Sequence, residues 1–342
     1  MKKYNSGEIY FIRETDYLTG KKTPFVKIGL VRYSDNRDSW GRLYEHQTGN
    51  PRKLSLDPKH VLSTQAVDLV EARLHKEFAQ FRISGEWFEF SSDSELGEAV
   101  KKAKALVQDV DSFIPKLQEA EELKWKPSNK VLLTSTEEYI ELAQQLAVAK
   151  GQIEKCDYLE SMILELLTTA QSEGRDVSKY SEVKVKGFTP TFKEEEFKTT
   201  HPELWEKYQG TEKSWYQRFL LKLKLKSDAD LGQEFNEAID KLTAIVESVT
   251  TSKDLGMLVE PNLELTHLRG LANWNQTVSQ TQLKLAIGDH EGIEGLCTWT
   301  RKENTSTKFD SKQFESENPE LYREFLTTGS STTILKPKKS KS

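Results

Sequence analysis

The stretch GEIYFIRETDYLTGKKTPFVKIGLV at residues 7–31 decides the fold of the N-terminal part of this chain. Residues 8–13 and 24–31 are mostly apolar, and residues 16–22 between them contain the turn-like sequence Thr-Gly-Lys-Lys. Short apolar runs on either side of a turn signal are typical of two antiparallel strands. The sequence therefore predicts a β-hairpin with a long connection, in which Tyr10 and Lys27 lie near each other on adjacent strands.

Two helices are predicted after the hairpin. Residues 39–47 form the first, and its Arg42 and His46 share one face because they are four positions apart. Residues 64–81 form the second, in which Glu71 stands beside an apolar stripe. The stripe repeats at three- and four-residue steps, the period of a helix, through Val67, Val70, Leu74, Phe78 and Phe81.

A third strand and a third helix complete the N-terminal pattern. Residues 86–90 are predicted to form the strand, and residues 95–125 the helix. The sequence Ser92-Asp93-Ser94-Glu95 has the form of a capping box, which marks a helix start.

These segments together resemble the GIY-YIG nuclease superfamily, and in particular its phage-type branch. The resemblance covers residues 7–90 and departs from the family pattern twice. The first motif begins with Glu8 rather than glycine, and Lys27 replaces the tyrosine of the second motif. The segments that carry it are Glu8-Ile9-Tyr10, Val26-Lys27-Ile28-Gly29, Arg42-Leu43-Tyr44-Glu45-His46, Thr48-Gly49-Asn50-Pro51, Val70-Glu71-Ala72-Arg73-Leu74-His75 and Gly85-Glu86-Trp87-Phe88.

The resemblance implies a fold and an activity for residues 1–110. The expected fold is α+β, with a small three-stranded antiparallel sheet flanked by helices. The expected activity is that of a metal-dependent DNA endonuclease that leaves a 5′-phosphate and a 3′-hydroxyl, in phage defence or phage DNA processing. The alternative is a DNA-binding module whose active site is retired, which the substitution at Lys27 motivates.

Phosphodiester hydrolysis suggests a role for each candidate catalytic residue. Glu71 would bind Mg²⁺ (or Mn²⁺), which accepts one carboxylate and keeps most of its waters. Arg42 would form a fork to the scissile phosphate. Tyr10 would be the general base, helped by positive charge from Lys27 and Arg42 because a free phenol has a pKa near 10. His46 would orient the water or share the base role.

Four further residues are candidates for substrate binding. Tyr10 and Arg42 are not expected to be core anchors, so their replacement should leave folding nearly intact. The substrate-binding candidates are Arg32, Arg37, Lys53 and His75.

Composition limits the class of protein. The chain has 342 residues, enough for two or three domains, and only 36% are apolar, which favours small cores and long exposed helices. There is no run of about 20 apolar residues and no apolar leader, so a cytoplasmic protein without a membrane span is expected. The two cysteines, Cys156 and Cys297, lack metal-binding spacing and are expected to be buried free thiols.

The net charge of −5 is divided unevenly. Residues 1–105 carry 18 Lys and Arg against 15 Asp and Glu, a net of +3, and residues 106–342 carry 31 against 39, a net of −8. Only the N-terminal part has the sign expected of a protein that binds DNA.

An internal duplication is predicted in the α-rich remainder of the chain. Residues 192–208 (FKEEEFKTTHPELWEKY) match residues 309–325 (FDSKQFESENPELYREF) at a shift of 117 positions. Each copy follows a long helical stretch and a short extended run, so the predicted unit is helix, hairpin, short helix. The expected domains are accessory repeats at 127–210 and 211–330, then a basic disordered tail at 331–342.

The second copy resembles the accessory region of YqaJ-type phage recombination exonucleases, through its Asn-Pro-Glu-Leu-Tyr ending and Cys297-Thr298-Trp299. This resemblance implies either a clamp on DNA or a dock for a phage or recombination protein through residues 127–330. Simple repeated packing is the competing interpretation. The net charge of −8 favours the protein dock, unless charge is segregated by face.

Overall fold

The computed structural model of the chain describes residues 4–48 and 50–338. Its N-terminal part is built on a five-stranded antiparallel sheet in the order β3-β1-β2-β5-β4. The α+β class predicted for this part is confirmed. The strands are β1 (Gly7–Thr15), β2 (Lys22–Arg32), β3 (Lys53–Thr64), β4 (Arg82–Ser84) and β5 (Trp87–Glu89).

The prediction of three strands is wrong, because β3 and β4 extend the sheet at its two edges. The apolar alternation of β3 is hidden in the sequence. Leu54 and Leu56 are buried, the exposed pair Asp57-Pro58 follows, and Leu62 is buried again. The register between β3 and β1 also shifts within this strand. A strand whose alternation is interrupted in this way lacks the period-2 signal on which recognition from sequence depends.

The two faces of the sheet carry different helices. Ile9 and Ile28 pack toward α2 (Val67–Glu77) and α3 (Asp93–Leu123), whereas Tyr10 and Val31 pack with Leu43 of α1 (Ser39–Thr48). Alternate residues of a strand point to opposite faces, so one hairpin supplies both layers. The sheet therefore presents Tyr10 to the same side as α1, the helix of Arg42 and His46.

The three helices predicted for this part are present, but the second is shorter than the predicted range of 64–81, because Thr64 belongs to β3 and α2 ends at Glu77. The apolar stripe of α2 is buried through Val67, Val70, Leu74 and Phe78. Ser92 caps α3, with its side chain accepting a hydrogen bond from the Glu95 backbone N–H at 3.1 Å.

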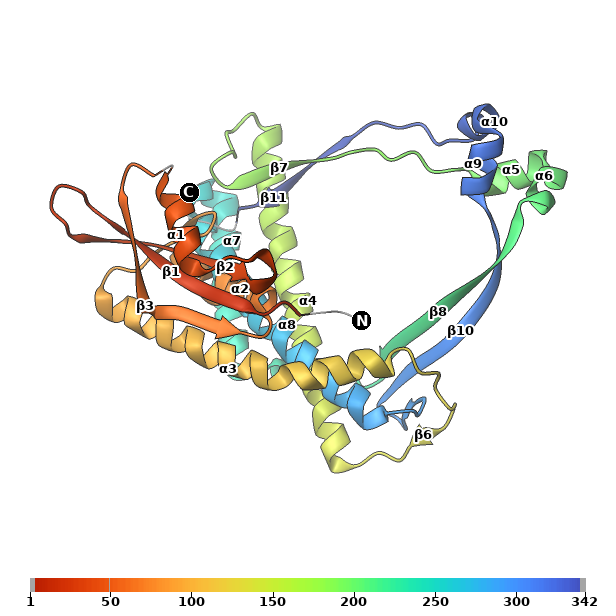
Figure 1. Cartoon of the computed structure of the whole chain (residues 1–342), viewed down its shortest axis with the longest axis horizontal. Coiled ribbons are helices and arrows are strands. Elements are labelled where there is room, and N and C mark those ends of the chain that lie inside the picture. Colours follow the sequence, from red (N-terminus) through yellow and green to blue (C-terminus); the bar gives the residue numbers. More distant parts are fainter. Residues whose placement is uncertain (1–3, 49, 339–342) are drawn as a thin grey trace.

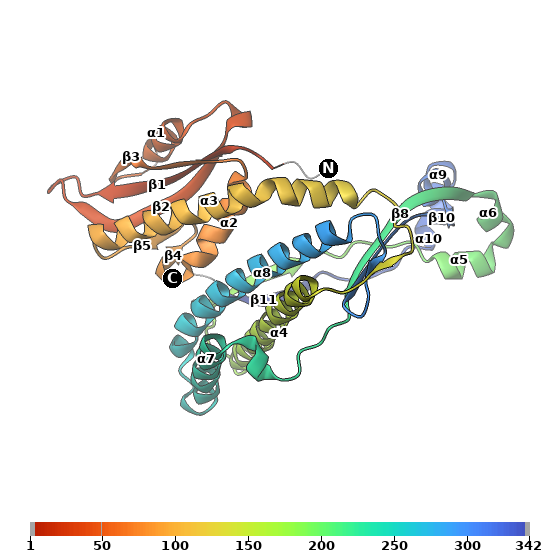
Figure 2. The ribbon, with the colours of Figure 1, turned by 90° about the horizontal axis from the view of Figure 1, so that it is seen from below.

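Three further helices form a body beneath the N-terminal part. Helix α8 (Val259–Ile287) packs lengthwise on α4 (Glu137–Ser172) and also contacts α3, while α7 (Gln233–Ser252) packs on α4 (Figure 2). Trp274 of α8 joins the two parts, since its ring lies 5.8 Å from that of Phe113 and 4.0 Å from the Arg73 guanidinium. Four single-turn helices are η1 (Tyr33–Asp35), η2 (Ala79–Phe81), η3 (Asp228–Leu231) and η4 (Leu255–Leu258).

Two ribbons leave the body and meet at a helical tip (Figure 1). The first ribbon pairs β7 (Ser181–Lys186) with β11 (Thr332–Pro337), and the second pairs β8 (Gln209–Leu221) with β10 (Cys297–Phe309). The short strands β6 (Leu132–Leu133) and β9 (Gly292–Ile293) extend the second ribbon at its base. The tip consists of α5 (Glu194–Thr200), α6 (Pro202–Lys207), α9 (Ser311–Glu317) and α10 (Pro319–Glu324).

The tip is held together by aromatic contacts that come in equivalent pairs. Phe192 stacks on Tyr322 at 4.8 Å, and Phe309, 117 positions after Phe192, stacks on Trp205 at 4.7 Å. The backbone N–H of Lys193 donates to the carbonyl of Phe325 at 2.8 Å, and that of Asp310 to the carbonyl of Tyr208 at 2.9 Å. The two matching sequence segments thus pack face to face, each serving as the partner of the other.

Two predictions for this region need correction. The expected hairpin within each repeat is wrong, because β7 pairs with β11 and β8 with β10. Each ribbon therefore pairs a strand that flanks residues 192–208 with a strand that flanks residues 309–325. The prediction of a disordered tail at 331–342 is also wrong for Thr332–Pro337, because these residues form β11. Leu335 packs against the core between α4 and α7, and this burial fixes the strand. Residues 339–342 of the predicted tail lie outside the described residues.

Cys156 and Cys297 are buried free thiols, as predicted. Among the helices of residues 4–48 and 50–338, none is long and apolar enough to cross a membrane.

Candidate active site

The candidate site is a polar pocket of about 330 Å³ beside the second half of β2. Strand β5 pairs only with residues 25–27 of β2, so the edge of β2 beyond them is open to the pocket. The lining residues come from β1, β2, η1 and the loop after it, α1, α2 and the turn before β5. They are Tyr10, Leu30, Val31, Arg32, Asp35, Arg37, Arg42, Glu71 and Glu86.

Helix α1 is anchored at its first turn by a carboxylate from β1. Glu8 accepts hydrogen bonds from the backbone N–H of Ser39 at 3.1 Å and from its hydroxyl at 2.7 Å. A negative charge is favoured at a helix N-terminus, where backbone N–H groups are unpaired. Glu8, the residue that departs from the family pattern, therefore helps to position Arg42 and His46.

Tyr10 lies in the sheet directly opposite Gly29. A Cβ atom at Gly29 would stand 2.4 Å from the Tyr10 hydroxyl, so glycine is required for the ring to cross the neighbouring strand. Tyr10 is only 1% exposed and packs with Ile12 and Leu43, which corrects the expectation that it is no core anchor. Its hydroxyl reaches the pocket and lies 3.2 Å from Nε2 of His46.

Burial sets the protonation of this pair. It raises the pKa of Tyr10 to about 12, although the Arg42 guanidinium beside the hydroxyl acts in the opposite direction. Burial also lowers the pKa of His46, and the positive charges of Lys27 and Arg42 lower it further. A neutral imidazole and a protonated phenol are thus favoured at neutral pH, with the ring nitrogen free to accept the phenolic proton.

Arg42 reaches the pocket from α1 with its guanidinium partly exposed. Glu45, one turn along the helix, accepts a hydrogen bond from it at 2.5 Å. Burial alone would lower the pKa of Arg42, but the hydrogen bonds to Glu45 and Tyr10 raise it. The guanidinium therefore stays charged at the mouth of the pocket, where a phosphate group can replace Glu45 as its partner.

Glu71 projects into the pocket from α2. Burial raises its pKa to about 7, and the negative charges of Glu86 and Asp68 contribute. No side chain among the described residues donates a hydrogen bond to the Glu71 carboxylate. A partly buried carboxylate that lacks such a partner and lies near the negative charges of Glu86 and Asp68 is poorly compensated, so the arrangement favours a cation.

Glu86 is a site residue that the sequence analysis missed. It forms an ion pair with Lys27, whose side chain is only 12% exposed, and it lines the same pocket as Glu71. Burial would raise the pKa of Glu86, but the hydrogen bond from Lys27 lowers it. The motif Gly85-Glu86-Trp87-Phe88 contained the signal, because it carries part of the family resemblance, but no role was predicted for its carboxylate.

The four candidates for substrate binding fall in different places. Arg32 and Arg37 line the pocket, where Arg32 pairs with Asp68. Lys53 is exposed at the start of β3 and is not among the lining residues. His75 lies behind β2, with Nε2 at 3.1 Å from the carbonyl oxygen of Ile28, which is a structural position.

The donor set fits a hard cation that keeps most of its waters. Among the described residues, no group of three or more His, Cys, Asp and Glu converges as a metal cage. Mg²⁺ is commonly bound by one or two carboxylates together with phosphate oxygens and water. Glu71 supplies such a carboxylate, and Glu86 lies in the same pocket.

A family model for the T5orf172 domain matches residues 7–110 of the chain. This domain is associated with nuclease-like, GIY-YIG-related proteins of phages and bacteria. No curated protein and no solved structure matches the chain. The matched residues contain the whole pocket, and the similarity associates this part of the chain with a nuclease-like, DNA-related function.

Proposed function

We propose that residues 7–110 act as a metal-dependent DNA endonuclease of the GIY-YIG type. The observation that carries this proposal is that Tyr10, Arg42 and Glu71, from three separate elements, line one polar pocket. A phenol, a guanidinium and a carboxylate around one centre are suited to phosphodiester hydrolysis. The T5orf172 match to the same residues supports the assignment and motivates a role in phage defence or phage DNA processing.

In this proposal the guanidinium of Arg42 binds the scissile phosphate and stabilises the charge that develops on it. The Tyr10 hydroxyl takes a proton from the attacking water as it passes its own proton to Nε2 of His46, 3.2 Å away. Glu71 would hold Mg²⁺ (or Mn²⁺), which when bound lowers the pKa of water and neutralises phosphate charge. Lys27 does not line the pocket itself and is paired with Glu86, so its role is to hold that carboxylate in place.

The experiment is a cleavage assay on single-stranded and double-stranded DNA with Mg²⁺, with Mn²⁺ and with a chelator. Cutting that needs the metal and leaves ends that a ligase can rejoin would support the proposal, because rejoining requires a 5′-phosphate and a 3′-hydroxyl. Absence of cutting on every substrate would overturn it.

A second candidate is a DNA-binding protein without catalysis. It is favoured by the high pKa of Tyr10, about 12, and by a lysine where the family has a second tyrosine. This candidate predicts binding without cleavage in the same assay. Binding of a phage or recombination protein through residues 127–330 also stays a prediction. A pull-down with the full chain as bait would test it.

A further inference from the structure

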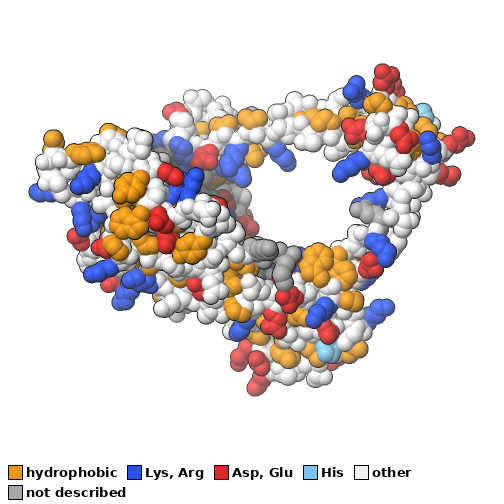
Figure 3. All heavy atoms as spheres, in the orientation of Figure 1, with side chains coloured by type: hydrophobic (Ala, Val, Ile, Leu, Met, Phe, Trp, Pro, Cys, Tyr) orange, Lys and Arg blue, Asp and Glu red, His pale blue; other side chains and the backbone are white. Residues whose placement is uncertain are grey.

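The two ribbons, the tip and the body enclose an opening that passes through the molecule (Figure 3). Strand β8 alone has 13 residues, a length of about 40 Å at the usual rise of a strand. The space-filling view shows Lys and Arg side chains on the ribbons around this opening. The opening is thus a framed passage, not a shallow groove.

The frame is continuous along the polypeptide. The chain runs from β7 through α5 and α6 into β8, and again from β10 through α9 and α10 into β11. The tip therefore cannot part without breaking the chain, even if its aromatic contacts are lost. On the body side, the frame is closed by Leu225 and Leu231, which pack on the core of α4 and α7. A polymer would enter by a free end.

Charge is segregated along the frame. The ribbon of residues 181–186 and 332–338 carries four Lys against one Glu, a net of +3. The second ribbon with its base, residues 209–226 and 297–309, carries eight Lys and Arg against two Glu, a net of +6, and of the eight cations Arg301 is buried. The tip, residues 193–207 and 310–324, carries five Lys and Arg against ten Asp and Glu, a net of −5. The overall acidity of this half of the chain conceals two basic ribbons, which suit a polyanion.

The strand register places the basic side chains of the first ribbon on one face. Lys184 is opposite Ile334, and Lys336 is opposite Glu182, two positions further along. Leu335 points to the other face and packs on the body. Within the described residues neither Lys184 nor Lys336 forms an ion pair. Their charges are therefore available to a ligand.

Aromatic side chains accompany the cations of the second ribbon. Tyr216 of β8 is partly exposed, with the Lys302 ammonium 5.6 Å from its ring. Beside the middle of β8, Trp125 is 52% exposed and its ring lies 6.1 Å from that of Trp215. Cations interleaved with exposed aromatic faces are typical of single-strand binding, because unpaired bases stack on the rings.

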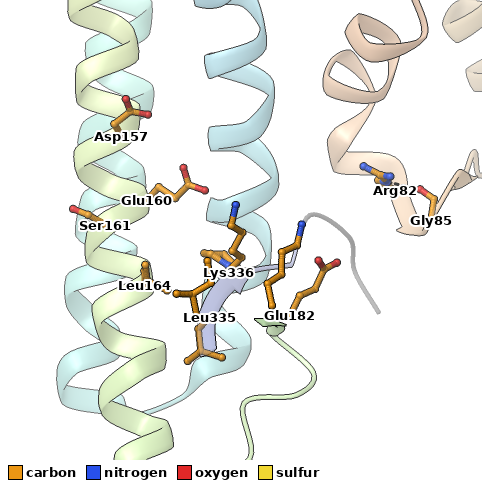
Figure 4. Close-up of a pocket in the computed structure, with 12 residues that line it drawn as sticks. Arg82, Gly85, Asp157, Glu160, Ser161, Leu164, Glu182, Leu335 and Lys336 are labelled. Atoms are coloured by element: carbon orange, nitrogen blue, oxygen red, sulfur yellow. Dashed lines mark hydrogen bonds between the residues drawn. The ribbon is translucent and has the colours of Figure 1, made fainter. Parts of the chain in front are cut away.

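A cleft of about 750 Å³ connects the first ribbon with the neighbourhood of the candidate active site. Arg82 of β4 and Gly85 of the turn between β4 and β5 form one wall, and Glu182 and Lys336 at the root of the ribbon form another (Figure 4). The next residue after Gly85 is Glu86, which lines the catalytic pocket. The same turn thus borders both spaces.

We propose that the opening is a passage through which single-stranded DNA is threaded by a free end. The basic ribbons hold the strand, the acidic tip repels it toward the body, and the turn between β4 and β5 leads it to the pocket of Tyr10 and Glu71. The inference rests on the proposed function for the fate of the strand, but threading itself is measurable without cleavage.

The test uses the full chain with Glu71→Gln and a single strand that carries biotin at both ends. Streptavidin is added either after or before the protein, and the complex is then washed at about 1 M salt, where exposed charges are screened. Threading predicts a salt-resistant complex only when the ends are blocked after loading. The inference would be overturned if equal amounts of complex resisted the salt wash in both orders of addition. It would also be overturned if the protein formed salt-resistant complexes with a closed single-stranded circle, or with duplex DNA and not with single strands.

A charge variant separates the ribbons from general electrostatics. The triple variant Lys184→Glu, Lys186→Glu and Lys336→Glu should lower loading by roughly tenfold or more, because three phosphate-binding cations are lost. The control changes the same number of exposed lysines elsewhere, Lys104→Glu, Lys241→Glu and Lys312→Glu, and should load as the parent does. Equal loss in both variants would contradict the role of the ribbons. If the loading result holds but the wild-type chain cuts no DNA, only the proposed nuclease activity fails.

Discussion

The Tyr10 hydroxyl lies 3.2 Å from Nε2 of His46, and this contact joins the buried sheet to the exposed helix α1. Because burial keeps the phenol protonated and the imidazole neutral, the two groups are matched as proton donor and acceptor. Their relationship leads to the first prediction.

Replacing Tyr10 with Phe should lower the rate of DNA cleavage by roughly 10²-fold, the scale of general acid–base effects. The ring still fills its place, so the loss of stability should be about 1 kcal/mol, that of one hydrogen bond. His46→Ala should have a similar effect on rate, and the double variant little more than either change, since the residues act as a unit. Single-turnover rates of the three variants provide the test, and multiplicative losses would show that the residues act separately.

Gly29→Ala should impair the site without touching a charged group. The added Cβ would stand 2.4 Å from the Tyr10 hydroxyl, so the ring must move, at a cost of about 1–3 kcal/mol from overpacking. Gly97→Ala on α3 is the matched control, because nothing lies within 4 Å of its Cβ. Gly29→Ala should lower both the temperature of thermal unfolding and the rate of cleavage, whereas Gly97→Ala should lower neither. Full activity of Gly29→Ala would contradict the placement of Tyr10.

Arg42→Ala should reduce cleavage by roughly 10²-fold through loss of charge stabilisation at the phosphate. Arg42→Lys should recover little, because an ammonium lacks the planar fork of the guanidinium. Both variants should fold, as this side chain is partly exposed on α1. The measurement is the cleavage rate together with a far-ultraviolet spectrum, and unfolding of Arg42→Ala at room temperature would refute the assignment.

Cleavage should rise with pH through about 7, the pKa of Glu71, because only the ionised carboxylate binds a cation. More Mg²⁺ should move this midpoint to lower pH by competing with the proton. In the metal-free protein, by contrast, the contribution of Glu71 to the free energy of unfolding should fall as the pH rises. A raised pKa means that the fold binds the proton more tightly, so the stabilisation is full below about 4.5 and is lost as pH rises through about 7. If the pH midpoint of the cleavage rate did not change with the Mg²⁺ concentration, Glu71 would be excluded as the residue that binds the metal.

Glu86→Gln should shift the same midpoint to lower pH. The negative charge of Glu86 helps to raise the pKa of Glu71, and its removal also releases Lys27 into the pocket. Glu89→Gln, three residues later on β5, is a control of equal charge change that lies outside the pocket lining. The test is the cleavage rate of the two variants measured as a function of pH. If both variants had the same pH midpoint, Glu86 would not influence the pKa of Glu71.

Much of the N-terminal part could be predicted because its signals are local. The period of α2, the cap at Ser92 and the hairpin around Lys27 are each contained within a few residues. Strand β3 was not predictable, because Asp57-Pro58 interrupts its alternation. The pairing of β8 with β10 joins residues nearly 90 positions apart, and no period or turn encodes such a contact. The sequence match between the two copies revealed the similarity of their segments but not that each copy packs on the other.

That three of the candidate residues lie together in one pocket was predictable, whereas the surroundings of the pocket were not. Tyr10, Arg42 and Glu71 were named from residue types at the spacing of the GIY-YIG pattern. Glu86 was missed because its role depends on the short pairing of β5 with β2, which brings that carboxylate to the edge of the pocket. His75 lies four positions after Glu71, but its side chain points inward to the backbone carbonyl of Ile28. Sequence spacing alone cannot distinguish such a structural histidine from one that faces the pocket.

The most direct test of the central claim compares wild type with Glu71→Gln, and with Glu119→Gln as an exposed control on α3, for cleavage of end-labelled DNA in Mg²⁺. We predict metal-dependent cutting by wild type and by the control, and a loss of roughly 10²-fold or more for Glu71→Gln. Equal cutting by all three proteins, or none by wild type, would contradict a nuclease centred on Glu71.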